Sequence, residues 1–206
     1  MNENAATVFL VDDDESSLTS VTRLFRASGM LVKPFSSAED FLAQLPPEAA
    51  GCVVTDLQMP CMSGIELQEA LAKSKNPLPI VFLTGQGDIP TSVKAMRHGA
   101  EDFLTKRAPD EELIAAVNRA LERDARERKV RIRRRELSAR FETLTPRERE
   151  VLTHVLRGEL NKQIAHALGI AERSVKRHRT SLMHKLQVQS VAELAQLAVE
   201  AGIGGR

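Results

Sequence analysis

The chain has 206 residues, of which 42% are hydrophobic and 28% are charged, a composition typical of a globular protein with two small domains. No apolar run approaches the roughly 20 residues that span a bilayer, and the N-terminal segment has no basic flank or cleavable apolar stretch, so we expect a cytoplasmic protein with no membrane partner. The net charge of +1 conceals two halves of opposite sign. Residues 1–120 have 10 basic and 17 acidic side chains, whereas residues 121–206 have 19 basic and 11 acidic side chains. The excess of basic side chains favours a polyanionic partner for the second half.

The first half alternates short β-branched or apolar runs with longer segments of helical period. We expect five strands, at Thr7–Val11, Leu31–Phe35, Cys52–Thr55, Ile80–Leu83 and Asp102–Leu104. Gly29 and Gly99 fall where helices would end, and Pro90 falls near the start of one. Strands that alternate with helices predict an α/β fold with a doubly wound five-stranded parallel sheet, whose ligand site lies at the carboxyl ends of the strands.

A single long helix is expected from about Asp110 to Arg140. Its first turns carry apolar residues that can pack on the sheet, whereas residues 122–129 have almost no apolar face, and we expect them in water. Val130, Leu137 and Leu144 recur every seven residues, with Phe141 between them, but Arg134 takes the remaining seam position. A weak coiled coil is one interpretation, and an exposed charged helical linker over residues 121–141 is the one that we prefer.

Only helical signals follow residue 142. Thr145 can cap a helix, Pro146 suits its first position, and Glu148 completes a capping box. Four helices fit, at about 146–157, 161–168, 172–186 and 190–201, with Gly158 and Gly169 between the first three. The second domain is therefore expected to be an all-α four-helix domain over residues 142–206.

The two cysteines, Cys52 and Cys61, are too few for a disulfide framework, and no His/Cys cluster accompanies them to form a zinc site. We expect both to be reduced residues that pack in the fold.

Acidic residues follow two of the predicted strands. Asp12, Asp13 and Asp14 come directly after Val8–Val11, and Asp56 comes directly after Cys52–Thr55. Because the carboxyl ends of parallel strands meet at one edge of a sheet, these carboxylates are expected to converge and to repel one another without a cation. A hard divalent ion such as Mg²⁺ is the natural occupant.

Two further side chains belong to the same edge. Thr84 follows the fourth strand and Lys106 follows the fifth, so a hydroxyl and an ammonium group join the carboxylates. A nucleophile, a metal site and two ligands for phosphoryl oxygens are what an aspartyl-phosphate site requires. Taken alone, Asp12–Asp14 could be a helix N-cap run, Thr84 a loop hydroxyl and Lys106 a solvated lysine. Their joint placement at the ends of four strands favours the phosphoryl-transfer site.

The order and spacing of these motifs resemble the receiver domain of two-component response regulators, over residues 6–120. The resemblance rests on Val11-Asp12-Asp13-Asp14, Thr55-Asp56-Leu57-Gln58-Met59-Pro60, Met62-Ser63-Gly64, Thr84-Gly85 and Phe103-Leu104-Thr105-Lys106. It implies a flavodoxin-like fold in which Asp56 accepts phosphate from a sensor histidine kinase.

The same resemblance implies roles for the surrounding residues. Asp13 would ligate Mg²⁺ (or Mn²⁺) directly, Asp12 would hold it through water, and Gln58 would offer its backbone carbonyl. Thr84 and Lys106 would bind the phosphoryl group. Phe103 matches the aromatic switch of the family, although a plain core phenylalanine is an equally good local interpretation.

The basic half contains a helix pair with a tight turn. Ile164, Ala165 and Leu168 are expected to pack one helix, Gly169 to turn the chain, and a second helix to begin near Glu172. In the second helix Val175, Leu182 and Leu186 would face inward, which leaves its basic residues on the outer face. That is helix-turn-helix geometry, in which the outer face enters a DNA major groove. A helix pair in an unrelated bundle is the alternative.

Leu144-Thr145-Pro146-Arg147-Glu148, Asn161-Lys162-Gln163-Ile164-Ala165 and Ser174-Val175-Lys176-Arg177-His178-Arg179 resemble the LuxR-type DNA-binding domain. Together with the receiver they place the chain in the FixJ/NarL class of response regulators. The resemblance implies that Lys176, Arg177 and Thr180 face the bases and that Lys162, Arg173 and Arg179 contact phosphates. His178 could reach DNA or pack between helices, and Ser174 belongs to the same motif.

The leading hypothesis is a transcription factor that phosphate on Asp56 controls, with a histidine kinase and double-stranded promoter DNA as partners. A homodimer is expected in the phosphorylated or DNA-bound state, with RNA polymerase as a further partner, and no enzymatic turnover is expected beyond the receiver's own phosphorylation and dephosphorylation. A hydrolase that uses Asp56, or a receiver that serves as an unphosphorylated dimerisation module, are the alternatives.

The chain departs from the receiver pattern after its lysine, where the family usually has proline and this chain has Lys106-Arg107-Ala108-Pro109. A cis bond before a non-proline residue costs roughly 3–4 kcal/mol, so we expect the Lys106–Arg107 bond to be trans.

Overall fold

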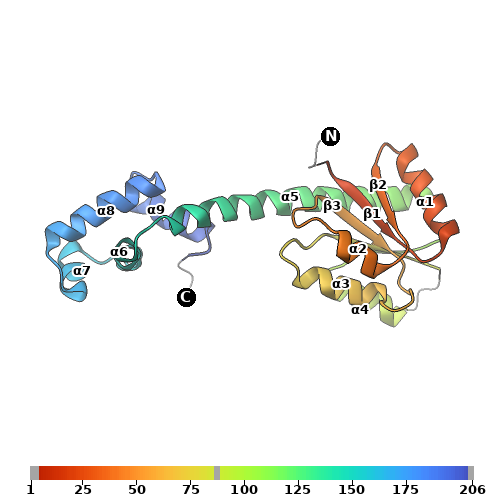
Figure 1. Ribbon diagram of the computed structural model, residues 1–206, viewed down its shortest axis with the longest axis horizontal. Helices are drawn as coiled ribbons and strands as arrows, with labels where there is room; N and C mark the ends of the chain where they lie inside the picture. The colour runs from red at the N-terminus through yellow and green to blue at the C-terminus, as the bar shows by residue number, and fades with distance from the viewer. Residues whose placement is uncertain (1–4, 86–88, 204–206) are drawn as a thin grey trace. The chain divides into compact units, whose positions relative to one another are not determined.

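The computed structural model describes residues 5–85 and 89–203 (Figure 1). The chain divides into two compact units, Met1–Arg128 and Lys129–Arg206. Helix α5 (Asp110–Glu142) contributes residues to both units. Each unit has a hydrophobic core of its own, as the composition predicts.

The first unit contains a five-stranded parallel sheet. Its strands are β1 (Thr7–Val11), β2 (Leu31–Phe35), β3 (Gly51–Thr55), β4 (Ile80–Thr84) and β5 (Asp102–Thr105). They lie in the order β2-β1-β3-β4-β5, and every adjacent pair is parallel. The five predicted strands and the doubly wound topology are confirmed, with differences of one residue at three strand ends.

Helices cover both faces of this sheet (Figure 1). They are α1 (Glu15–Ala27), α2 (Ala38–Gln44), α3 (Gly64–Lys73), α4 (Ile89–Arg97) and the first part of α5. Successive side chains of a strand point to opposite faces, so Phe9 and Val11 pack with α2, α3 and α4, whereas Val8 and Leu10 pack with α1 and α5. Gly29 and Gly99 follow α1 and α4 with φ of 80° and 86°, as expected of residues that end helices.

Both cysteines are reduced, but they occupy different environments. Cys52 lies in β3 and is buried, and this burial raises the pKa of its thiol. Cys61 is exposed in the loop after β3 and has a φ of 65°, in the left-handed region. The prediction that both pack in the fold is therefore wrong for Cys61, because its hydrophobicity does not decide the position of a loop residue.

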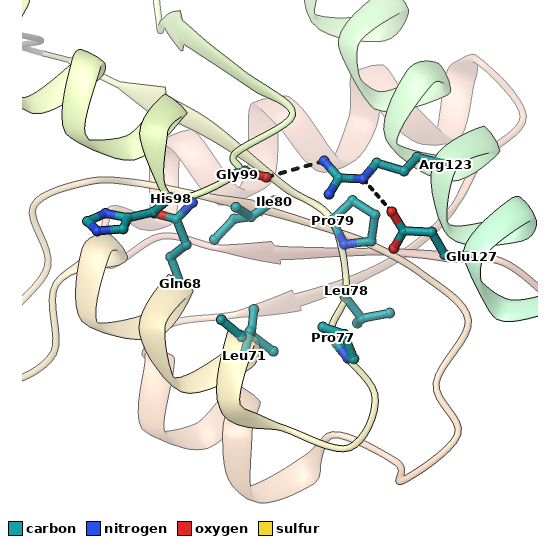
Figure 2. A pocket seen from close by; sticks show the side chains of 11 residues that line it. Gln68, Leu71, Pro77, Leu78, Pro79, Ile80, His98, Gly99, Arg123 and Glu127 are labelled. Atoms are coloured by element: carbon teal, nitrogen blue, oxygen red, sulfur yellow. Dashed lines mark hydrogen bonds and ion pairs between the residues drawn. The ribbon is translucent and has the colours of Figure 1, made fainter. Parts of the chain in front are cut away.

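The charged stretch of α5 is not wholly in water, contrary to expectation. Asp124 is 1% exposed, and its carboxylate accepts a hydrogen bond of 2.9 Å from the backbone N–H of Gly51, the first residue of β3. Arg123 donates hydrogen bonds to the Gly99 carbonyl and to the Glu127 carboxylate. These three residues line a pocket near the start of β4 (Figure 2). Polar groups of the sheet's amino-terminal edge therefore bind this part of the helix.

The second unit is helical. It contains α6 (Pro146–Leu156), α7 (Asn161–Leu168), α8 (Glu172–Leu186) and α9 (Val191–Glu200), which confirms the four predicted helices. The capping box of Thr145 and Glu148 is present at the start of α6. Leu137 and Phe141 of α5 join Leu144 in the core of this unit, whereas Val130 is 67% exposed. Leu137 and Leu144 thus serve this core, whereas Val130 does not, so the three heptad residues share no common packing partner among the described residues.

Candidate phosphoacceptor site and DNA-binding surface

Three carboxylates converge at the carboxyl edge of the sheet. β1 and β3 are neighbours and Val11 pairs with Thr55, so the residues that follow these two strands lie side by side. Oxygen atoms of Asp12, Asp13 and Asp56 all lie within 4.8 Å of one another. Asp12, Asp13 and Asp56 therefore converge as predicted, and the cause is the strand register. Asp14 is not part of the described cluster, because its side chain caps α1 by accepting a hydrogen bond from the Ser16 backbone N–H at 2.9 Å.

Asp12 is the most buried member of the cluster, with 2% of its surface exposed. Its Oδ1 accepts a hydrogen bond from the Asp14 backbone N–H at 3.0 Å, and its Oδ2 accepts one from the Ser17 hydroxyl at 2.7 Å. Sequence reasoning did not identify Ser17, because a serine in the first turn of a helix carries no signal for a partner.

Lys106 bridges two of the carboxylates. Its ammonium lies 2.6 Å from Asp12 Oδ2 and 2.8 Å from Asp56 Oδ2. Partial burial opposes the charged form, but the hydrogen bonds to Asp12 and Asp56 outweigh it and raise the pKa of Lys106 above its ordinary value. The Lys106 backbone N–H donates to the Thr84 carbonyl at 2.8 Å, which anchors the loop to β4. The Lys106–Arg107 bond is trans, as predicted, like every peptide bond in the part of the chain that the structure describes.

Asp56 is half-buried and directs its two oxygens to different groups. Oδ1 accepts from the backbone N–H groups of Leu57 and Gln58, at 2.6 and 3.3 Å, whereas Oδ2 contacts Lys106. Gln58 is exposed in the same loop. The backbone donors on Oδ1 hold the carboxylate in one orientation, and Oδ2 faces the ammonium group of the Lys106 side chain.

Thr84 and Phe103 complete the predicted set. Thr84 ends β4 and is 1% exposed. Phe103 is half-buried in β5, and its ring centroid lies 5.8 Å from that of Phe82. A nucleophilic carboxylate, two acidic neighbours, a lysine and a buried threonine at one sheet edge can support phosphoryl transfer to a carboxylate.

The second unit displays a helix-turn-helix. Gly169, with a φ of 64°, ends α7 and turns the chain toward α8. Val175, Leu182 and Leu186 are completely buried, as predicted, so the opposite side of α8 faces outward. Of the proposed DNA-contacting residues, Lys162, Arg173, Lys176, Arg177 and Thr180 are exposed, and Ser174, His178 and Arg179 are partly exposed.

Two polar contacts of α8 were not predicted. The Arg179 guanidinium donates a 2.7 Å hydrogen bond to the Asn161 side chain at the start of α7, which joins the two helices of the motif. Glu148 of α6 is 4% exposed and accepts hydrogen bonds from Ser181 and Lys185 of α8, each at 2.7 Å. The sequence indicates that Glu148 caps a helix but carries no signal for partners more than 30 residues away.

This network changes the ionisation of Glu148. Burial by itself raises the pKa of the carboxyl group, but hydrogen bonds from Lys185, Ser181 and Thr145 outweigh that effect and lower the pKa to about 2. The charged form of Glu148 therefore stabilises the packing of α6 against α8.

Comparison with known proteins identifies a family for each unit. Residues 8–118 match the response regulator receiver domain, and residues 142–198 match the luxR family of bacterial regulatory proteins. The chain belongs to the response regulators with a LuxR-type DNA-binding domain. Such proteins are the transcription factors of two-component systems, and this response regulator spans the lengths of its relatives almost completely.

Nodulation protein W of Bradyrhizobium diazoefficiens is 43% identical over 198 residues, which cover 96% of this response regulator and 87% of the relative. The transcriptional regulatory protein FixJ of Rhizobium meliloti is 40% identical, with coverages of 96% and 97%. The solved structure of the response regulator StyR is 46% identical and superposes with a TM-score of 0.80 over 95% of this chain and 99% of StyR. No helix among the described residues is long and apolar enough to cross a membrane.

Proposed function

We propose that a sensor histidine kinase phosphorylates this response regulator on Asp56 and that the phosphate controls binding to promoter DNA. The receiver would comprise residues 6–120, followed by a helical linker over 121–141 and the DNA-binding domain over 142–206. The observation that supports this most strongly is the convergence of Asp12, Asp13, Asp56 and Lys106 at the sheet edge. The protein would act in the cytoplasm, where both kinase domain and DNA are accessible.

The donor set fits a small hard cation. Oxygen atoms from three carboxylates within 4.8 Å, with a backbone carbonyl at Gln58, are the ligands that Mg²⁺ or Mn²⁺ prefers. Asp13 and Asp56 would bind the ion directly, and Asp12, whose two oxygens already accept hydrogen bonds, would bind it through water. When bound, the ion neutralises charge on the phosphoryl group and on the carboxylates.

The chain's own residues supply the remaining steps. An Asp56 carboxylate oxygen forms a bond to phosphorus while the bond from phosphorus to the donor's histidine nitrogen breaks. Lys106 leaves the Asp56 carboxylate and contacts a phosphoryl oxygen, and the Thr84 hydroxyl contacts another. Phe103, which is already half-buried beside Phe82, would turn inward as Thr84 moves. Release of phosphate from Asp56 is the only turnover that we propose.

In the DNA complex α8 would enter the major groove. Lys176, Arg177 and Thr180 would face bases, and Lys162, Arg173 and Arg179 would bind phosphates. Ser174 and His178 lie on the same helix and are only partly exposed, so they would contact DNA at the edge of this surface. A homodimer would place two such helices on two half-sites, with RNA polymerase recruited beside them.

The first experiment replaces the nucleophile. With acetyl phosphate and Mg²⁺, we expect stoichiometric phosphorylation of the wild type and none of Asp56→Asn, because an amide is a poor nucleophile. Asp40→Asn, a change in the exposed first turn of α2, is the control and should be labelled like the wild type. Intact-protein mass spectrometry measures the added phosphate. Stoichiometric labelling of Asp56→Asn would refute the assignment.

The second experiment concerns DNA recognition. Lys176→Ala and Arg177→Ala should each lose about 1–3 kcal/mol of discrimination between specific and nonspecific DNA if they contact bases. Lys162→Ala should weaken binding to both DNAs and reduce the slope of log affinity against log salt by about 1. Footprinting with and without a phosphodonor identifies the operator. An unchanged specificity ratio in both α8 variants would place recognition elsewhere.

A further inference from the structure

Ser17 of α1 donates a hydrogen bond to the most buried carboxylate of the phosphoacceptor site. Its hydroxyl lies 2.7 Å from Asp12 Oδ2, the same oxygen that Lys106 contacts at 2.6 Å. Ser20, one turn later in the same helix, instead donates to the backbone carbonyl of Ser16 within its own helix. The Ser17 hydroxyl therefore donates its hydrogen bond to the site, whereas the Ser20 hydroxyl donates to the backbone of its own helix.

The shared oxygen couples Ser17 to Lys106. With 2% of its surface exposed, Asp12 has little contact with water, so its oxygens depend on donors from the protein. Its described donors are the Asp14 N–H on Oδ1, and Ser17 and Lys106 on Oδ2. If Lys106 leaves Asp12 to contact a phosphoryl group, Ser17 is the side-chain donor that stays on Oδ2.

We propose that Ser17 is a positioning residue for phosphoryl transfer to Asp56, because it holds Asp12 Oδ2 while Lys106 moves to the incoming phosphoryl group. Without the hydroxyl, departure of Lys106 removes the last described protein donor from a buried carboxylate oxygen, which makes that departure costlier. Ser17 contacts Asp12, and it would act on the reaction through Asp12 and Lys106. This inference rests on the proposed function of Asp56.

The experiment compares phosphorylation with metal binding. In Ser17→Ala we expect phosphorylation by acetyl phosphate at saturating Mg²⁺ to slow by about ten- to a hundredfold, which corresponds to the loss of one hydrogen bond to a charged group. Titration calorimetry with Mg²⁺ alone should give a Kd within about twofold of the wild type, because Asp12 stays in place and Asp13 and Asp56 are unchanged. Slower phosphorylation with unchanged Mg²⁺ affinity is the result expected if Ser17 holds Asp12 while Lys106 moves to the phosphoryl group.

Two variants isolate the hydroxyl. Ser17→Thr keeps the donor and should recover phosphorylation to within about twofold of the wild type. Ser20→Ala removes a hydroxyl of the same helix that donates to the Ser16 carbonyl, and it should behave like the wild type. Thermal unfolding of all three variants verifies that the receiver remains folded.

Three results would overturn the inference: labelling of Ser17→Ala within twofold of the wild type, a parallel loss of Mg²⁺ affinity, or failure of Ser17→Thr to recover the rate. Asp56→Asn is measured beside them. If Asp56→Asn is still phosphorylated, the proposed function fails. If Asp56→Asn is inert while Ser17→Ala is normal, only the role of Ser17 fails.

Discussion

The buried carboxylate of Glu148 makes the stability of the DNA-binding unit depend on pH. The pKa of this group falls from 4.5 to about 2 in the folded chain, a difference of about 2.5 units, and each unit corresponds to about 1.4 kcal/mol. Ionised Glu148 therefore contributes roughly 3–4 kcal/mol to the free energy of unfolding. Because the folded pKa is the lower one, this contribution is complete above pH 4.5 and is lost as the pH falls toward 2.

Glu148→Gln tests this contribution with little change of shape. The amide can still accept the Thr145 N–H bond of the capping box, but it leaves the Lys185 ammonium without its charged partner. We expect a loss of roughly 3–4 kcal/mol at pH 7 that falls by about half at pH 3, since the carboxyl group of the unfolded chain is then protonated whereas that of the folded chain is still mostly ionised.

Urea unfolding followed by circular dichroism measures the free energy, and amide hydrogen exchange in α6 and α8 assigns it to this unit. Glu150→Gln is the matched control, because Glu150 is exposed on the same helix and forms a surface ion pair with Arg147, a contact worth less than about 1 kcal/mol. A Glu148→Gln variant that is no more destabilised than Glu150→Gln, or whose loss of stability does not depend on pH, would contradict the stabilising role of ionised Glu148.

Three further substitutions test local features of the fold. Cys61→Gly should raise the stability of the receiver by about 0.5–1 kcal/mol in urea unfolding, because the φ of 65° strains any residue with a Cβ, and Cys61→Ala should give no such gain. Asp124→Ala should cost about 1–3 kcal/mol by leaving the Gly51 N–H unsatisfied, and a loss no greater than that of the exposed control Glu122→Ala would contradict this. Leu137→Ala should destabilise the second unit by about 2–5 kcal/mol whereas Val130→Ala changes it by less than about 0.5, and equal effects in calorimetry would restore the coiled-coil interpretation.

The sequence by itself was sufficient for the elements and their order. The five strands, the four helices of the second unit and the inward residues Val175, Leu182 and Leu186 followed from hydrophobic period and capping residues, which are local properties of the chain. The convergence of Asp12, Asp13 and Asp56 also followed from the sequence, because parallel strands bring the residues after their carboxyl ends to one edge.

Tertiary structure alone decided which polar groups meet. Asp124 belongs to a charged segment that by its period should be in water, yet it is buried because the N–H of Gly51, 73 residues away, requires an acceptor. Leu137 and Leu144 have the spacing of a coiled coil but pack with α6 and α8. Ser17 is one of several serines near the start of α1, and only the packing of that helix beside the sheet directs its hydroxyl to Asp12. Period reports which face of an element is apolar, whereas a hydrogen bond between distant residues depends on the assembled fold.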